Sequence, residues 1–165
     1  MAKNTILTTE QSALRIRRIA FQIHESNTDV DEIVVAGIMS NGFKLAEEIA
    51  KVLTEISSLK VVCCEVHIDK KSPLDPITTS LEASQYSQKS LVLIDDVLSS
   101  GSTLMYGVRH FLSVPLLRFK TAVLINRNHK KFPVKADFKG VSLSTSMHEH
   151  IEVVCTKTGF EAFLT

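Results

Sequence analysis

Residues 91–103 read Leu-Val-Leu-Ile-Asp-Asp-Val-Leu-Ser-Ser-Gly-Ser-Thr, an apolar run followed by two carboxylates and then by small residues. Four consecutive apolar residues are typical of a short buried strand, and the small residues predict a turn into the N-terminus of a helix. Backbone N–H groups and the positive end of the helix dipole can hold a phosphate there, and Gly101 permits its close approach. The hydroxyl groups that can add to this cradle belong to Ser99, Ser100, Ser102 and Thr103.

The two carboxylates, Asp95 and Asp96, predict a different ligand group. They would repel a phosphate, but they accept hydrogen bonds from sugar hydroxyls or from water on a divalent cation. The segment therefore indicates a phosphorylated sugar rather than bare phosphate. Neither Gly-Lys-Ser/Thr nor Gly-x-Gly-x-x-Gly, the two standard nucleotide signatures, occurs in the chain. A solvated acidic loop is the alternative interpretation of an isolated aspartate pair.

Short apolar runs alternate with amphipathic segments on both sides of residues 91–103. Runs too short for helices predict strands, and segments with a period of 3.6 predict helices. Thr8 and Gln11 have the spacing of a capping box at the start of the first helix. The alternation predicts an α/β fold, a doubly wound, mainly parallel sheet whose ligands lie beyond the carboxyl ends of the strands. The predicted strands are 33–38, 61–66, 91–94 and 121–125, and the predicted helices are 9–24, 45–56 and a third that ends near 111.

The length of 165 residues predicts a single domain, residues 1–165, because it supports one hydrophobic core. Two segments depart from the alternation. Residues 68–89, approximately, contain Pro73 and Pro76 with many Ser and Thr residues, and they predict an excursion or flap. From about 126 to 155 the periodicity weakens around short strands near 138–143 and 151–154, which predicts a small C-terminal hood subdomain.

Composition excludes several classes of protein. Hydrophobic residues make up 44% of the chain and charged residues 22%, which argues against a disordered or collagen-like chain. The net charge of +1 disfavours binding of nucleic acid through bulk positive charge. Three cysteines, of which Cys63 and Cys64 are adjacent, form no disulfide framework and predict a reducing compartment. Because no apolar run would span a bilayer and no signal peptide is visible, a cytoplasmic protein without a membrane partner is expected.

Four stretches resemble the type I phosphoribosyltransferases and, within that family, the PyrR group of pyrimidine operon attenuators and uracil phosphoribosyltransferases. Residues 91–103 resemble the ribose-phosphate motif that is the hallmark of the family. The other three resemble the first helix, the pyrophosphate loop and the segment after the fourth strand of the PyrR group; they are residues 6–25, 35–42 and 122–146.

The resemblance implies a reaction between 5-phosphoribosyl-1-pyrophosphate and a nucleobase, with Mg²⁺ as cofactor, that gives a nucleotide and pyrophosphate. Likeness to the PyrR group makes uracil the expected base and UMP the expected product. Asp95 and Asp96 would be the catalytic residues, holding the ribose hydroxyls directly or through metal-bound water. The other implied contacts are the 5′-phosphate with Leu98, Ser99, Ser100, Gly101, Ser102 and Thr103, the pyrophosphate with the amides of Met39, Ser40, Asn41 and Gly42, and the base with Lys135 and Ile151. Val97 is a further implied substrate-binding residue.

The chain departs from the family pattern at positions that contact substrates. Ser99 stands where purine-salvage members carry an acid that faces the purine ring, so a purine substrate is disfavoured. The PyrR group carries arginine where this chain has Asn41 and Ser102, so two cationic anion ligands are missing. Lys70 or Lys71 on the flap could replace a further arginine as a point charge, though not as a bidentate fork. Catalysis is therefore expected in weakened form.

Three expectations concern the periphery of the site. Family members often strain a peptide in the pyrophosphate turn, which here lies near Met39-Ser40. Lys135 and Ile151 have the alternative of being a surface lysine and a core isoleucine. The pair His148-x-His150 could chelate a metal, but two histidines without a third ligand are usually surface residues.

An RNA-binding, nucleotide-sensing regulator with little turnover is the alternative function on the same fold. In the PyrR group a basic face that includes part of the first helix binds mRNA, and residues 109–139 here contain eight Lys or Arg against Asp137 alone, a local balance of +7. Attraction of phosphorylated substrate or simple solvation also explains this charge. The resemblance further implies a homo-oligomer, a dimer or tetramer. The basic residues are Arg109, Arg118, Lys120, Arg127, Lys130, Lys131, Lys135 and Lys139, to which the first helix could add Arg15, Arg17, Arg18 and His24.

Overall fold

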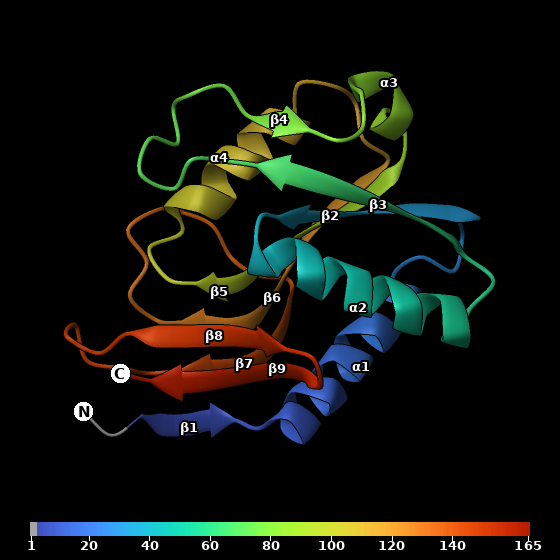
Figure 1. The fold of residues 1–165 in the computed structure, drawn as a ribbon. Helices are drawn as coiled ribbons and strands as arrows, with labels where there is room; N and C mark the ends of the chain where they lie inside the picture. Colours follow the sequence, from blue (N-terminus) through green and yellow to red (C-terminus); the bar gives the residue numbers. More distant parts are fainter. Residues whose placement is uncertain (1–2) are drawn as a thin grey trace.

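The computed structural model describes residues 3–165, which form two β-sheets and four helices (Figure 1). The main sheet has the strand order β4-β3-β2-β5-β6-β7, and neighbouring strands are parallel except for β3 with β4. The predicted doubly wound, mainly parallel sheet is therefore confirmed. In chain order its strands are β2 (Glu32–Ile38), β3 (Lys60–His67), β4 (Thr78–Thr79), β5 (Ser90–Leu98), β6 (Arg118–Arg127) and β7 (Phe138–Leu143).

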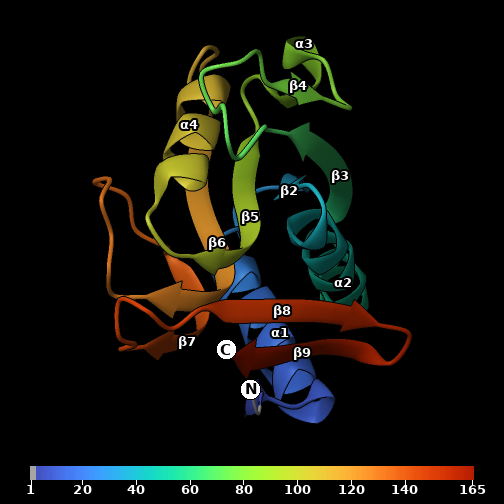
Figure 2. The same cartoon turned by 60° about the vertical axis from the view of Figure 1, so that its left-hand side comes forward.

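Helices cover both faces of the main sheet (Figure 2). Helices α1 and α2 pack on one face, and α4 lies on the other with the short α3. Cys63 packs against the core beneath α1 and α2, whereas Cys64 lies in the core beneath α4, so the adjacent cysteines point to opposite faces as predicted. No helix within residues 3–165 has the length and apolar character needed to cross a membrane. The helices are α1 (Thr9–Glu25), α2 (Asn41–Ile56), α3 (Ala83–Tyr86) and α4 (Ser102–Phe111).

The helices differ in how their N-termini are capped. At the start of α1 the predicted capping box is present: the Thr8 hydroxyl accepts a hydrogen bond from Gln11 N–H at 3.2 Å, and the Gln11 side chain accepts one from Thr8 N–H at 2.9 Å. The N-cap residues of α2 and α4, Ser40 and Gly101, make no side-chain cap hydrogen bond. Helix N-termini without such a cap are suited to binding anions.

The order of strands reverses direction between β2 and β5. After β2 the chain adds β3 and β4 on one side, and after β5 it adds β6 and β7 on the other. Because β2 and β5 are parallel neighbours, their carboxyl ends meet at one edge of the sheet, where α2 and α4 begin. In open α/β sheets such a switch point is where ligands bind.

The second sheet is antiparallel and joins the two ends of the chain, with β9 (Gly159–Leu164) between β1 (Asn4–Leu7) and β8 (Ile151–Thr156). Strand β1, near the start of the described chain, accordingly lies beside β9, near its end (Figure 1). Sequence patterns predicted a strand near 151–154 but neither β1 nor β9. Residues 138–143, expected in the hood, form β7 at the edge of the main sheet, parallel to β6. The smaller sheet therefore combines β8 with both chain ends.

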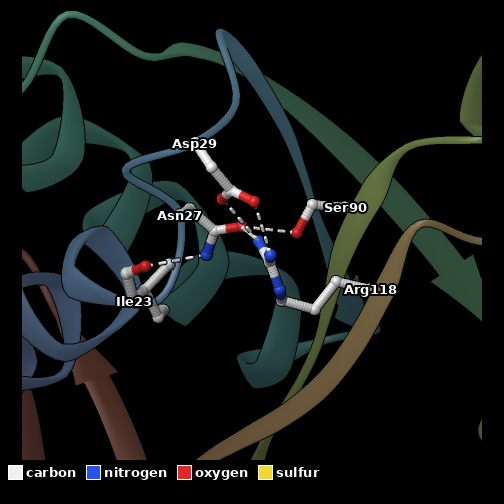
Figure 3. Close-up of polar contacts among 5 residues, drawn as sticks. All are labelled: Ile23, Asn27, Asp29, Ser90 and Arg118. Atoms are coloured by element: carbon white, nitrogen blue, oxygen red, sulfur yellow. Dashed lines mark hydrogen bonds and ion pairs between the residues drawn. The ribbon is translucent and has the colours of Figure 1, made fainter.

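A buried polar cluster centred on Asn27 fixes the opposite, amino edge of the main sheet (Figure 3). Asn27 is 1% exposed; its Nδ2 donates to Ile23 O at 2.7 Å, and its Oδ1 accepts from Ser90 Oγ at 2.5 Å and from Arg118 Nη1 at 3.1 Å. Arg118 also donates to both carboxylate oxygens of the exposed Asp29. Because Ser90 begins β5 and Arg118 begins β6, the cluster ties the end of α1 to two strands.

Replacing Asn27 with alanine is expected to lower the free energy of unfolding by about 1–3 kcal/mol, because the buried Ser90 hydroxyl loses its acceptor. Urea denaturation measures this change. Asp29→Asn is the matched control, since it alters the solvent-exposed end of the same cluster and should change stability much less. An Asn27→Ala protein as stable as the wild type would show that the cluster does not hold the sheet edge.

Candidate functional site

The acid pair, Asp95 and Asp96, lies within β5, which continues beyond the predicted end of the strand at Ile94. The two residues are in contact, since Asp96 N–H donates a hydrogen bond to Asp95 Oδ1 at 2.9 Å. Asp95 is 3% exposed and lies against Lys70 of the flap, residues 68–89. Asp96 is half-buried and contacts Asn41 at the start of α2. The acid pair therefore faces two different parts of the site.

Asp95 is held in a strongly desolvated position. Burial, followed by the neighbouring Asp96 carboxylate, raises the pKa of the Asp95 carboxyl to about 8, and Lys70 acts in the opposite direction. Lys70 Nζ lies 3.7 Å from Asp95 Oδ1. Burial therefore favours the neutral form of this carboxyl. A ligand that hydrogen-bonds to the ionised form is expected to displace the proton.

The stability of the protein is expected to depend on Asp95 between about pH 5 and pH 8. In the unfolded chain this carboxyl ionises near pH 4, whereas in the fold it keeps its proton up to about pH 8. The unfolded state thus binds fewer protons in this range, so the stability falls as pH rises. Relative to the wild type, Asp95→Asn should gain melting temperature from pH 5 to pH 8, measured with a metal chelator present. A difference that stays constant over that range would contradict the raised pKa.

Asn41 links the acid pair to the smaller sheet. Its Nδ2 donates to Asp96 Oδ2 at 3.2 Å and to Val153 O in β8 at 2.8 Å. The side chain that stands where the PyrR group has arginine is therefore engaged within the protein. Its backbone N–H, in the first turn of α2, remains the part of Asn41 that is predicted to contact pyrophosphate.

The predicted pyrophosphate turn, residues 39–42, lies directly against the end of β5. The peptide bond between Met39 and Ser40 is cis, at the position where the resemblance implied an unusual peptide. A Cβ atom at Gly42 would lie 2.9 Å from Ile94 O and 3.2 Å from Asp95 Oδ1, so glycine is what lets α2 begin this close to the acid pair. Two segments far apart in the sequence therefore share one edge of the sheet.

The predicted phosphate loop, residues 99–103, turns sharply at Gly101, whose φ of 86° is in the left-handed region that favours glycine. A Cβ atom there would also lie 2.7 Å from Val134 Cγ1. The loop is held from outside because Ser100 O accepts hydrogen bonds from the N–H groups of Lys131, at 2.8 Å, and Phe132, at 3.1 Å. Helix α4 begins directly after it, with the dipole orientation that favours an anion.

A cavity of about 170 Å³ lies beside the phosphate loop. Its wall combines the Asp95 carboxyl and the Lys70 side chain with the loop and with apolar residues of β6 and α4. Lys70, one of the two lysines predicted to replace a flap arginine, thus reaches the site. The predicted site residues that line this cavity are Asp95, Val97, Leu98, Ser99, Ser100, Gly101 and Thr103.

The two residues predicted to contact the base, Lys135 and Ile151, do not line this cavity. The Lys135 side chain is 85% exposed, and its Nζ lies 3.9 Å from Asp137 Oδ1. Ile151, at the start of β8, is partly buried and packs against the core beneath α1 and α2. No group of three His, Cys, Asp or Glu within residues 3–165 could hold a metal, so His148 and His150 acquire no third ligand there.

Arg127 is a functional candidate that sequence patterns presented only as part of a basic segment. It is 8% exposed at the end of β6, and its Nη1 donates to Ser99 Oγ in the phosphate loop at 3.3 Å. The rest of the guanidinium donates to residues 145–149. The available signal was an arginine two residues beyond the apolar run 121–125, because the acid pair likewise lies just beyond the apolar run of β5.

The acid pair is also the group that could hold Mg²⁺. This ion is usually bound through one or two carboxylates together with substrate phosphates and water, rather than in a cage made by protein alone. Two adjacent carboxylates, without a third metal-ligating side chain beside them in the described residues, fit that mode. The donor set is therefore suited to Mg²⁺ that arrives with a phosphorylated substrate.

Comparison with known proteins shows a similarity that covers nearly the whole chain. The phosphoribosyl transferase domain family matches residues 3–157. The chain is 33% identical over 162 residues to the bifunctional protein PyrR of Streptococcus thermophilus, with coverage of 95% of this chain and 92% of the relative. It is 36% identical over 161 residues to the bifunctional protein PyrR of Fusobacterium nucleatum, with coverage of 92% and 90%.

Solved structures share the fold at lower identity. A hypoxanthine-guanine phosphoribosyltransferase of Bacillus anthracis matches with a TM-score of 0.77 at 19% identity, covering 100% of this chain and 99% of that chain. The hypoxanthine phosphoribosyltransferase of Trypanosoma cruzi matches with a TM-score of 0.73 at 16% identity, covering 87% and 83%. Together with the domain match and the relatives above 30% identity, this fold establishes that the chain belongs to the type I phosphoribosyltransferase family and is similar to its PyrR members.

Proposed function

We propose that the protein transfers the phosphoribosyl group of 5-phosphoribosyl-1-pyrophosphate to uracil, which gives UMP and pyrophosphate. The observation that carries this proposal is the cavity in which Asp95 meets the phosphate loop, at a switch point where two helices begin without side-chain caps. The cavity wall and the adjoining turn offer carboxylate acceptors together with hydroxyl and amide donors. A pentose with free hydroxyls and two phosphorylated ends matches that combination.

The proposed roles follow from the movement of charge in the reaction. As the bond from C1 to the pyrophosphate oxygen breaks, its electron pair goes to pyrophosphate and positive charge develops on the ribose. The amides of residues 39–42 would face the leaving group while the amides of residues 99–103 and the hydroxyls of Ser100, Ser102 and Thr103 hold the 5′-phosphate, so the sugar is fixed between two anion sites. Asp95 and Asp96 would accept hydrogen bonds from the ribose hydroxyls. Bound Mg²⁺ would neutralise negative charge on the pyrophosphate.

Uracil and a low turnover are both part of the proposal. The likeness to the PyrR group supports uracil, and the hydroxyl of Ser99 in the cavity wall offers no acid to a purine ring. Lys70 is the cationic side chain in that wall. Asn41 and Ser102 are neutral where the PyrR group carries arginine, so fewer charge-assisted contacts hold the phosphates and turnover should be slow.

A direct assay tests the proposal. The protein is incubated with phosphoribosyl pyrophosphate, Mg²⁺ and one nucleobase at a time, and release of pyrophosphate is followed against a blank without base. Release is expected to be fastest with uracil, compared with cytosine, hypoxanthine, guanine and adenine. If no base raises the release of pyrophosphate above the blank, the enzymatic proposal is overturned. If release is fastest with a purine, the assignment of uracil is overturned.

A nucleotide-sensing RNA regulator is the second candidate, favoured by the placement of one basic loop. Lys130 and Lys131 are exposed, and the Lys131 N–H binds Ser100 O, so a ligand in the phosphate loop sits next to this basic loop. Arg127 is buried and Arg118 is ion-paired, so the basic face is smaller than the charge count implied.

Filter binding of pyrimidine-operon leader RNA, with and without UMP, tests this second function. It predicts an affinity that depends on UMP and falls in Lys130→Gln/Lys131→Gln. An RNA affinity that changes neither with UMP nor with these substitutions would contradict the regulatory function. Sedimentation velocity on the same samples measures the proposed dimer or tetramer.

A further inference from the structure

Arg127 is a buried charge beside the site to which the proposed reaction assigns no role. All four of its hydrogen bonds go to neutral oxygens. The ion pairs formed among residues 3–165 do not include this guanidinium. Its positive charge is thus held at 8% exposure without a carboxylate within ion-pair distance, although the pKa of the nearby Glu149 carboxyl is lowered by hydrogen bonds from Ser146 and, to a smaller extent, by Arg127. The acceptors are the hydroxyls of Ser99 and Thr145, at 3.3 and 2.9 Å, and the carbonyls of Ser146 and Glu149, at 3.3 and 2.9 Å.

Ser99 connects the buried Arg127 side chain to the cavity. Its Oγ accepts the hydrogen bond from Arg127 Nη1, and the residue lines the cavity together with Asp95. A guanidinium has donors and no acceptor, so the Ser99 hydroxyl cannot give its own proton to Arg127. That proton is left for an acceptor on another group. Because Ser99 lines the cavity, a ligand bound there is a group that could accept this proton, and the buried positive charge of Arg127 lies on the other side of the hydrogen bond.

We propose that Arg127 is a positioning residue that selects the nucleobase through Ser99, favouring bases that present a carbonyl oxygen to Ser99 over bases that present an amino group there. This inference rests on the proposed phosphoribosyl transfer. Uracil belongs to the favoured class. Cytosine supplies a matched comparison, because it has the same ring with an amino group in place of one carbonyl oxygen.

The chemistry of bond formation explains why such a charge favours these bases. The lone pair of the ring nitrogen forms the new bond to C1 while the bond from C1 to the pyrophosphate oxygen breaks and its electrons leave with pyrophosphate. The proton of that ring nitrogen passes to solvent. A ring that has given up its proton before the new bond is complete carries negative charge spread onto its carbonyl oxygens. A fixed donor backed by a buried cation stabilises that charge without having to reorganise.

Steady-state kinetics of Arg127→Met and Arg127→Lys with uracil and cytosine test the inference. Arg127→Met is expected to lower the uracil-to-cytosine ratio of kcat/KM about tenfold or more, while the KM for phosphoribosyl pyrophosphate stays nearly constant. Arg127→Lys keeps the charge and should restore part of the ratio. The rise of kcat/KM for uracil with pH should move to higher pH in Arg127→Met, because loss of the base proton is no longer assisted.

Two further variants separate selection from a structural role. Thr145→Val removes one acceptor of Arg127 but keeps its charge and its contact with Ser99, so it should lower the melting temperature and leave the ratio unchanged. Ser99→Ala should lower the ratio as Arg127→Met does. An unchanged ratio and pH profile in Arg127→Met, with only a lower melting temperature, would overturn the inference.

The inference can also be tested if the protein does not catalyse the proposed reaction. If none of the nucleobases causes the wild type to release pyrophosphate above the blank, selection is measured instead by calorimetry as the affinity for UMP relative to CMP. A preference for UMP that disappears in Arg127→Met would support the inference while the catalytic proposal falls. Equal affinities of the wild type for UMP and CMP would overturn the inference itself.

Discussion

Asp95→Asn/Asp96→Asn is expected to weaken binding of phosphoribosyl pyrophosphate by roughly two to four orders of magnitude, because two charge-assisted hydrogen bonds are worth about 1.5–3 kcal/mol each. Both carboxyls lie at the edge of the sheet where the pyrophosphate turn and the phosphate loop meet. Isothermal titration calorimetry with phosphoribosyl pyrophosphate and Mg²⁺ measures the loss. Pyrophosphate release with any nucleobase should fall with it.

The double variant should remain folded, which makes the loss of binding interpretable. Asparagine is neutral and nearly isosteric, and burial already favours the neutral form of Asp95. Asp31→Asn is the control, because Asp31 is an exposed acid just before β2, at the opposite edge of the sheet. Unchanged affinity in the double variant would refute the site, and an equal loss in Asp31→Asn would show that net charge is responsible.

Ser102→Arg is expected to raise the affinity for phosphoribosyl pyrophosphate about 10- to 100-fold, since it adds one charge-assisted contact to the 5′-phosphate. Ser102 is the first residue of α4 and is only half-buried, so a longer side chain has room to extend. Asn41 is less suitable for the same substitution, because its side chain already binds Asp96 and the backbone of β8. The KM for phosphoribosyl pyrophosphate and calorimetry both report the change.

Ser113→Arg is the matched control for added charge. Ser113 is exposed just beyond the carboxyl end of α4, so arginine there adds the same charge without reaching the phosphate loop. An equal gain in both variants would indicate long-range attraction rather than a contact. Weaker binding in Ser102→Arg, with an unchanged melting temperature, would mean that the first turn of α4 does not face the phosphate.

Local patterns were sufficient for four of the six strands of the main sheet and for most of the cavity. Apolar runs flanked by turn residues predict β2, β3, β5 and β6 because parallel strands are buried on both faces. The capping box at Thr8 and the opposite orientation of Cys63 and Cys64 also follow from local geometry. In residues 91–103 the strand, the acids and the loop are contiguous, so their spacing alone predicts that they share one site.

Features that depend on contacts between segments far apart in the sequence could not be predicted from local patterns. Strands β1 and β9 exist because the two ends of the chain pair with each other, and neither segment has a distinctive local pattern. Arg127 looked like one of several basic residues, and its burial appears only when Ser99 and residues 145–149 surround it. Lys135, chosen by resemblance, points to Asp137 and solvent, which local sequence does not reveal.

A crystal structure of the protein with phosphoribosyl pyrophosphate and Mg²⁺ bound examines the whole account at once. The expected electron density has the 5′-phosphate against the amides of residues 99–103 and the hydroxyls of Ser100, Ser102 and Thr103, and the ribose hydroxyls at Asp95 and Asp96. The pyrophosphate should lie at residues 39–42. Density for the sugar phosphate anywhere else, or none at a saturating concentration, would contradict the assignment of this edge of the sheet.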